Sequence, residues 1–288
     1  MNIKRYIATI ILAIVLLLNF SCTDWLDVKP VDRMSEDQLY STEAGFRQAL
    51  NGIYVELNHA DLYGDELLVN TVEILAQRYK FSSMGTLTNQ YHLAEFDYTT
   101  DYAKKCGSRI WEKAYALIAN VNKLLKNADS HKDLFTGDSY DLITGEAYAL
   151  RAFLHFDLVR LFGWGNLAKK PENLEKLCMP YMTKYDKVLT KQLTVGEVLA
   201  HIEEDLLASI ELLNNSDPYG LAPKSDDYDL PNEDKFFDNR EKRFNYWAAV
   251  CTLTRVYMWM GRKREALPLA TSFIDKGGRT SWIDSYTI

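Results

Sequence analysis

Residues 145–163 read GEAYALRAFLHFDLVRLFG, and this stretch decides the fold of the chain. It lies within a predicted helix over residues 141–162, because apolar side chains recur at steps of three and four residues. A helix that is apolar nearly all round packs on several sides, so we expect other helices to cover it. The apolar positions on one face are Ala147, Leu150, Leu154, Leu158 and Leu161, and those on other faces are Tyr148, Phe153, Phe156, Val159 and Phe162.

Segments on both sides of this stretch carry the same helical period. Ser41 or Thr42 is a suitable N-cap for a helix over residues 42–59. Thr194 and Glu197 have the spacing of a capping box, which predicts a helix from there to about residue 214. Gly261 predicts a turn between two final helices. The remaining predicted helices are residues 65–79, a segment through 111–128, residues 244–260, and residues 262–276 with Pro268 kinking the last one or delaying its start.

Antiparallel helix pairs joined by tight turns are typical of a helical-repeat solenoid. No proline occurs between residues 31 and 170, which suits helices and argues against a β-sandwich. Two segments break the helical pattern, residues 81–101 and the acidic residues 215–243, and we predict long loops in both. The predicted fold class is therefore all-α, with antiparallel helix pairs that form a tetratricopeptide-like solenoid with long loops.

Composition excludes several classes of function. The 288 residues contain 33 Lys and Arg against 40 Asp and Glu, for a net charge of −7. Nucleic-acid binding needs a basic surface for the phosphates, so we expect no nucleic-acid partner. Hydrophobic residues make up 47% of the chain and charged residues 25%, as in an ordinary packed globular protein.

The first 21 residues have the features of a signal peptide. Lys4 and Arg5 precede an apolar run of 12 residues, 7–18, which is shorter than the roughly 20 residues of a membrane-spanning helix. Ser21 and Cys22 follow, as in a bacterial lipobox, where the cysteine takes a diacylglycerol and palmitate-like acyl chains anchor the protein. We therefore expect a lipoprotein signal peptide over residues 1–21 and a helical domain over residues 22–288. The alternative is a secreted soluble protein cut near Ser21.

Motifs for catalysis are missing from the sequence. The patterns GxSxG, HExxH, GxxxxGK[ST] and GxGxxG do not occur, and the five histidines are scattered. Cys106, Cys178 and Cys251 have no CxxC spacing, so neither a zinc site nor a disulfide framework is expected, although one pair remains free to oxidise. We predict a protein that is not an enzyme and that carries no metal and no cofactor.

Six segments, taken in order, resemble the SusD/RagB family of Bacteroidetes outer-membrane lipoproteins. The fourth, residues 145–163, is the most specific of them. The segments are CTDWLDVKP at 22–30, FRQALNGIYVEL at 46–57, WEKAYALIANVN at 111–122, GEAYALRAFLHFDLVRLFG at 145–163, TVGEVLAHIEEDLLASIELL at 194–213 and WAAVCTLTRVYMWMG at 247–261.

This resemblance implies a fold and a role. The fold is helical with tetratricopeptide-like units. The role is that of a surface-facing, lipid-anchored outer-membrane protein that binds oligosaccharides, or peptides in some branches, for a SusC-like TonB-dependent β-barrel transporter. Because family members usually continue well beyond the last helix pair here, we also expect the family's C-terminal part to be missing. The alternatives are a helical-repeat scaffold that binds protein, or a non-functional fragment of a truncated gene.

The resemblance further implies a ligand site that draws on the loop before the helix at Trp111. Aromatic rings there can stack on the C–H faces of sugars, and amides can bind hydroxyls. We expect Tyr98 and Tyr102 to stack on the sugar, and Trp164 is a second candidate. For any single tyrosine, ordinary packing is the alternative. The candidate ligand-binding residues are Asn89, Gln90, Tyr91, Tyr98, Tyr102 and Trp164.

Overall fold

The computed structural model describes residues 35–81 and 85–277. The expected signal peptide and Cys22 lie outside the described residues. Contacts divide the chain into two units, residues 1–38 and 39–288. In the described part of the first unit, Ser35 and Gln38 exchange reciprocal backbone-to-side-chain hydrogen bonds of 3.0 and 3.2 Å at the start of a short helix. Every helix and strand from residue 43 onward belongs to the second unit.

Helices make up most of the described chain, and a two-stranded antiparallel ribbon accompanies them. The helices are α2 (Glu36–Leu39), α3 (Glu43–Leu57), α4 (Thr71–Leu75), α5 (Thr88–Ala94), α6 (Asp101–Ser130), α7 (Ser139–Phe162), α8 (Val195–Ser216), α9 (Tyr246–Met260) and α10 (Lys263–Ser272), and the strands are β1 (Leu177–Met179) and β2 (Leu193–Thr194). The predicted all-α class is confirmed.

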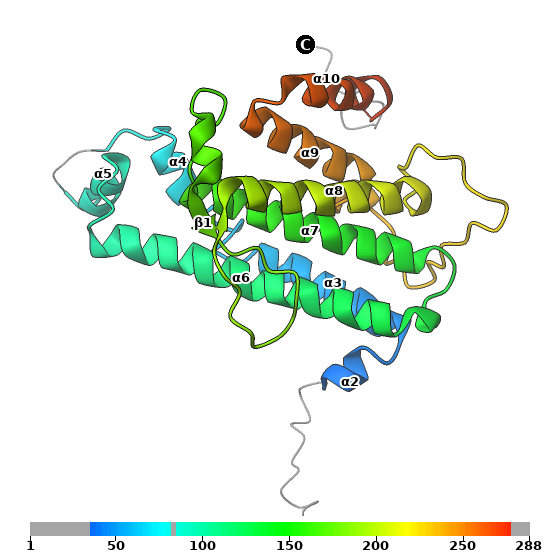
Figure 1. The fold of residues 1–288 in the computed structure, drawn as a ribbon. Coiled ribbons are helices and arrows are strands. Elements are labelled where there is room, and N and C mark those ends of the chain that lie inside the picture. Colours follow the sequence, from blue (N-terminus) through cyan, green and yellow to red (C-terminus); the bar gives the residue numbers. More distant parts are fainter. Residues whose placement is uncertain (1–34, 82–84, 278–288) are drawn as a thin grey trace, which may run out of the picture. The chain divides into compact units, whose positions relative to one another are not determined.

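The long helices pack against one another in layers. Helix α7 contacts α6 on one side and α8 on the other, α8 contacts α9, and α9 contacts α10 (Figure 1). Helix α3 packs on α6. Since α7 buries residues on all its faces, the stretch at 145–163 lies inside the core, as its sequence predicts.

Local signals account for several helix boundaries. The hydroxyl of Thr42 accepts the N–H of Gly45 at 3.2 Å and begins α3. Both bonds of the predicted capping box are present: the Glu197 N–H donates to the Thr194 hydroxyl at 3.2 Å, and the Thr194 N–H donates to the Glu197 carboxylate at 2.7 Å. Gly261 has a φ of +77° and makes the turn between α9 and α10.

Three predicted elements were wrong in part. Residues 65–79 were predicted as one helix, but only Thr71–Leu75 is helical. Tertiary contacts explain the difference, because the preceding turns bury Glu66, whose carboxylate accepts bonds from Thr71 and Arg109. Residues 81–101 were predicted as loop but contain α5. The last helix was predicted over residues 262–276, with Pro268 kinking it or delaying its start. It starts at Lys263 with Pro268 inside it and ends as an α-helix at Ser272, and a π-helical turn continues from Phe273 to Gly277.

A buried ionic cluster joins the layers. Arg151 of α7 donates from Nε and Nη2 to the two carboxylate oxygens of Asp205 on α8, at 2.6 Å each. Its Nη1 donates to Asn122 of α6 at 2.9 Å, and the Tyr181 hydroxyl donates to Asp205. A buried charge needs a partner and saturated hydrogen bonds. This cluster therefore sets how α6, α7 and α8 stack.

A second cluster holds the long loop of residues 217–245 to the core. Glu146 of α7 is fully buried and pairs with Arg240 from the loop. Arg240 also donates to Asp217 at 2.5 Å, and the Tyr54 hydroxyl donates to Glu146 at 2.6 Å. The segment predicted as a loop, residues 215–243, is a loop apart from its first two residues, which end α8, and a 3-10 turn at Arg240–Lys242. Ion pairs hold it to the core.

Candidate ligand-binding pocket

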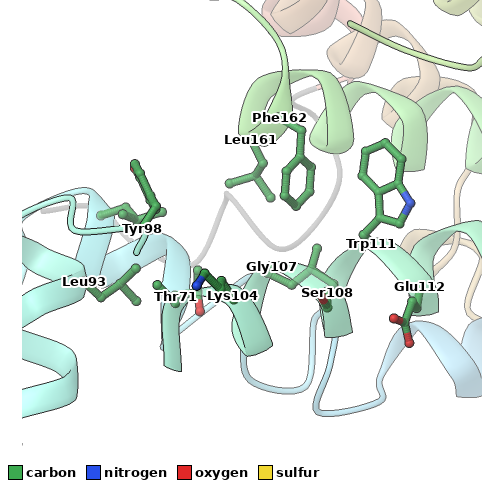
Figure 2. Close-up of a pocket in the computed structure, with 13 residues that line it drawn as sticks. Thr71, Leu93, Tyr98, Lys104, Gly107, Ser108, Trp111, Glu112, Leu161 and Phe162 are labelled. Carbon is green, nitrogen blue, oxygen red and sulfur yellow. The ribbon is translucent and has the colours of Figure 1, made fainter. Parts of the chain in front are cut away.

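A pocket of about 600 Å³ lies where the end of α7 faces α4 and the first turns of α6 (Figure 2). Its volume is in the range of pockets that take small ligands. The lining residues are Thr71, Leu75, Leu93, Tyr98, Ala103, Lys104, Gly107, Ser108, Ile110, Trp111, Glu112, Leu161 and Phe162.

Three aromatic side chains stand around this pocket. Trp111 of α6 and Phe162 of α7 meet edge to face, with ring centroids 5.2 Å apart and an interplanar angle of 88°. Figure 2 shows Tyr98 on the opposite side of the pocket from Phe162 and Trp111. Tyr98 lines the pocket and is 57% exposed, so its side chain is accessible to a ligand.

The turn between α5 and α6 positions Tyr98. The Asp97 carboxylate accepts the N–H of Thr99 at 3.0 Å and its hydroxyl at 2.6 Å, and the hydroxyl bond lowers the pKa of Asp97. Phe96 adopts a left-handed φ of +58°. The Thr100 hydroxyl then accepts the N–H of Ala103 at 3.3 Å and begins α6. The Tyr98 backbone is therefore held between a side-chain-bonded turn and a capped helix.

Polar groups line the pocket on one face of α6. Lys104, Ser108 and Glu112 are four residues apart, so they follow one another along the same exposed helix face beside Trp111. An ammonium group, a hydroxyl and a carboxylate supply both donors and acceptors. This combination of aromatic walls and a mixed polar edge can hold a molecule that has apolar faces and many hydroxyls.

The two tyrosines that the sequence predicted to stack on a sugar lie in different surroundings. Tyr98 lines the pocket, whereas Tyr102 packs against the small cluster of Ile74, Leu93 and Ala103 beneath it. Burial raises the pKa of the Tyr102 hydroxyl.

The other candidates lie outside the pocket lining. Asn89, Gln90 and Tyr91 lie on α5, where the Tyr91 ring meets the edge of His92. Trp164 follows α7, is half-exposed, and carries the ammonium of Lys176 3.9 Å from its ring centroid. Of the six candidate ligand-binding residues, Tyr98 is therefore the one that lines this pocket.

The sequence did not single out as ligand-binding candidates five residues that line the pocket, which are Lys104, Ser108, Trp111, Glu112 and Phe162. Trp111 and Phe162 are 51 positions apart, and only the packing of α6 on α7 brings their rings together. Their apolar periodicity indicated core packing alone.

Within residues 35–81 and 85–277, no group of three or more His, Cys, Asp or Glu side chains is arranged to hold a metal ion. Cys106, Cys178 and Cys251 are free thiols. None of the described helices is long and apolar enough to span a bilayer.

Stacked helix pairs with an aromatic-lined pocket define the class, a helical-repeat protein with a ligand-sized site. The chain belongs to the SusD-like family, described as starch-binding and associating with the outer membrane, whose model matches residues 24–225. The resemblance to this family is thereby confirmed, and the sixth segment, residues 247–261, lies beyond the matched residues.

Named relatives and solved structures agree with this membership. SusD-like proteins P2 and P25 of Formosa agariphila are 28% identical over 160 residues and 27% identical over 175 residues, covering 56% and 59% of this chain. The chain spans 30% and 33% of those two proteins.

The crystal structures show the same fold. A SusD superfamily protein from Bacteroides thetaiotaomicron has a TM-score of 0.60 and 22% identity, with 83% of this chain and 48% of that chain covered. A SusD-like carbohydrate binding protein from Bacteroides vulgatus has a TM-score of 0.62 and 19% identity, with 83% and 46% covered.

Proposed function

We propose that this protein is a lipoprotein of the outer membrane that binds oligosaccharides in the pocket between Tyr98, Trp111 and Phe162. The observation that carries the proposal is the exposed side chain of Tyr98 across a 600 Å³ pocket from the Trp111–Phe162 pair. Membership of a family described as starch-binding supports a sugar as the ligand.

The chemistry of a neutral sugar fits this arrangement. A pyranose ring has C–H faces that pack on aromatic rings, and its equatorial hydroxyls need donors and acceptors at the rim. Lys104, Ser108 and Glu112 supply these at helical spacing along the pocket edge. Apolar side chains such as Leu93, Ile110 and Leu161 also line the pocket, which favours a ligand that is desolvated on one side.

The anchor and the partner complete the proposal. Cys22 takes a lipid after removal of residues 1–21, and the acyl chains hold the protein at the outer membrane facing outward. The protein then passes its ligand to a SusC-like TonB-dependent β-barrel transporter. The outer-membrane association in the family description supports this location.

The test is a binding screen on the purified chain. Isothermal titration against neutral oligosaccharides of four to eight sugars, including α-glucans, β-glucans and galactans, is expected to find at least one saturable ligand. A parallel panel of peptides of the same length gives the alternative ligand class. Saturable binding of peptides with none for any oligosaccharide would overturn the sugar assignment.

A further inference from the structure

A second pocket, of about 350 Å³, is also lined by residues near the end of α7. Its aromatic walls come from three parts of the chain: Tyr63 lies between α3 and α4, Phe153 is on α7 and Trp259 is on α9. The Tyr63 and Phe153 rings stack with centroids 5.3 Å apart and an interplanar angle of 25°. Because aromatic side chains from three separate parts of the chain surround it, this pocket is a concave site.

The charges in this pocket do not cancel. Its lining contains one carboxylate, Asp157, and two guanidinium groups, Arg160 and Arg255. The Asp157 carboxylate is already occupied, because Oδ1 accepts Arg160 Nη1 at 2.8 Å and Oδ2 accepts the Tyr63 hydroxyl at 2.8 Å. Burial and the neighbouring Asp157 raise the pKa of Tyr63, which keeps its hydroxyl a donor. One positive charge is therefore left over in a chain whose net charge is −7.

Arg255 carries that remaining charge. Its Nη2 lies 3.9 Å from Asp157 Oδ1, beyond hydrogen-bond distance, and within the described residues it makes no hydrogen bond. Its guanidinium lies 6.0 Å and 5.6 Å from the ring centroids of Phe153 and Phe156, and its side chain is 48% exposed. Arg255 is thus placed by aromatic packing and by a long ion pair with Asp157, and its N–H donors remain without hydrogen bonds among the described residues.

A further donor lies in the same wall. The indole Nε1 of Trp259 is buried and has no hydrogen-bond partner among the described residues. Arg255 and Trp259 can both give hydrogen bonds, and neither can accept one, so the groups of the pocket that lack a hydrogen-bond partner are donors. The Arg255 side chain is exposed, whereas the Trp259 nitrogen is buried. Donors beside an unbalanced positive charge select an oxyanion.

The two pockets are neighbours. Leu161 lines both of them, and α4 contributes Thr71 and Leu75 to the first and Val72 to the second. An extended ligand can therefore reach from one pocket to the other around the α7 end.

We infer that the second pocket binds an oxyanion on an acidic sugar, a carboxylate or a sulfate ester, through Arg255, with a neighbouring sugar of the same chain in the pocket at Tyr98. This inference rests on the proposed function and narrows its substrate class to acidic oligosaccharides. Arg160 stays on Asp157 and orients the pocket, while Arg255 makes the new ion pair. A neutral oligosaccharide leaves the donors of Arg255 to water.

The experiment is isothermal titration of the purified chain with three probes of equal length: an oligogalacturonate, a sulfated galactan oligosaccharide and an unsulfated galactan oligosaccharide. The parent chain is expected to bind at least one acidic probe tighter than the neutral probe. Arg255→Gln should weaken binding of that acidic probe about ten- to a hundredfold, since a hydrogen-bonded charge pair is lost. Arg255→Lys should retain part of the preference, and raising the salt concentration should reduce it.

The control is Arg78→Gln, which removes one positive charge from a side chain that is 72% exposed and outside both pockets. It should leave the preference for the acidic probe in place. The carboxylate and sulfate probes distinguish the two sources of the oxyanion. No binding of either acidic probe, or equal binding of acidic and neutral probes, would overturn the inference, as would an Arg255→Gln chain that keeps the full preference. The neutral screen described above decides the proposed function separately.

Discussion

Arg151 on α7 and Asp205 on α8 form a buried bidentate ion pair, with both N···O distances at 2.6 Å. The stretch with the strongest family resemblance therefore contributes a structural bond between helix layers. Its residues Glu146, Arg151 and His155 are all buried and lie outside the lining of both pockets. The signal that identifies the family therefore includes the packing of the scaffold. The C-terminal half of the same stretch also lines the two pockets, through Phe153, Asp157, Arg160, Leu161 and Phe162.

Removing one partner of this pair should destabilise the fold strongly. Arg151→Met leaves the Asp205 carboxylate buried without its cation, and the expected loss in the free energy of unfolding is about 3–5 kcal/mol. The double variant Arg151→Met/Asp205→Leu should lose less than the sum of the two single variants, because no charge is left unpaired. Urea denaturation followed by circular dichroism measures these differences.

An exposed pair provides the control for that series. Arg78 lies 3.7 Å from Glu73, and its side chain faces solvent. Arg78→Met should cost less than about 1 kcal/mol. Similar losses for Arg78→Met and Arg151→Met would refute the structural role of the buried pair.

His155 should make the fold sensitive to acid. Its Nδ1 lies 2.8 Å from the Arg151 carbonyl, which can only accept, and its Nε2 lies 3.1 Å from the Met182 N–H, which can only donate. The ring is therefore neutral with the proton on Nδ1. Burial lowers the pKa of His155 from 6.5 to about 3.

The direction of the pH effect follows from this lowered pKa. Between pH 6.5 and about 3 the unfolded chain binds a proton at His155 and the folded chain does not, so stability falls as the pH is lowered through this window. The contribution reaches about 1.4 kcal/mol per pH unit. His155→Gln should flatten the plot of unfolding free energy against pH, measured by urea denaturation at several values from pH 7 to 4. His201→Gln, at a half-exposed histidine, is the control, and an unchanged slope in His155→Gln would contradict the prediction.

Two helical glycines should respond in opposite directions to alanine. A Cβ at Gly145 would lie 2.9 Å from Leu213 Cγ, inside the α7–α8 contact, so Gly145→Ala should cost about 1–3 kcal/mol. Gly52 on α3 has nothing within 4 Å of the same position, so Gly52→Ala should stabilise by up to about 1 kcal/mol. Thermal denaturation of both variants checks the pair, and a stabilised Gly145→Ala chain would show that α7 and α8 pack less closely than described.

The sequence predicted best those helices that have a long run of apolar residues at helical spacing and a local signal at the helix boundary. Thr42 and the Thr194–Glu197 box define two helix starts by bonds within four residues, so their geometry is readable from local sequence. Residues 65–79 also have apolar periodicity, but the burial of Glu66 on Arg109 is a long-range event that no local pattern reports. Tertiary contacts override propensity there.

The pocket was predictable only in part for the same reason. An aromatic-rich segment before α6 pointed to Tyr98, which does line the pocket. Tyr102 is four residues further on, and this places it on the first turn of α6, facing the small cluster with Ile74. The opposite wall, Leu161 and Phe162, comes from the end of α7, and its position depends on how α7 packs on α6.

The anchor prediction concerns Cys22, which lies outside the described residues. We expect Cys22→Ser to move the protein from the membrane to the soluble fraction, because the lipid that holds it has lost its attachment site. Cys251→Ser, at a free thiol on α9, is the matched control and should stay with the membrane. Cell fractionation after a high-salt wash gives the readout. Retention of Cys22→Ser in the outer membrane would refute the lipoprotein assignment.

The last prediction concerns the stacking face in the ligand pocket. Tyr98→Ala should weaken binding of an oligosaccharide that the parent chain binds by about tenfold, since a stacked ring is worth roughly 0.5–1.5 kcal/mol beyond the area it buries. Phe162→Ala should weaken it similarly, because Phe162 forms the opposite wall with Trp111.

Two further tyrosines separate stacking from folding in the same titration. Tyr102→Ala should lower thermal stability, since its ring packs on the cluster around Ile74 and Leu93, and its affinity should remain close to that of the parent while the chain is folded. Tyr79→Ala removes another exposed tyrosine ring that lies outside both pockets, so neither affinity nor stability should change much. Isothermal titration with folding checked by circular dichroism gives all four values. Parent-like affinity in Tyr98→Ala would remove the α5–α6 turn from the site and point to Trp164, an aromatic candidate with a half-exposed ring beside Lys176.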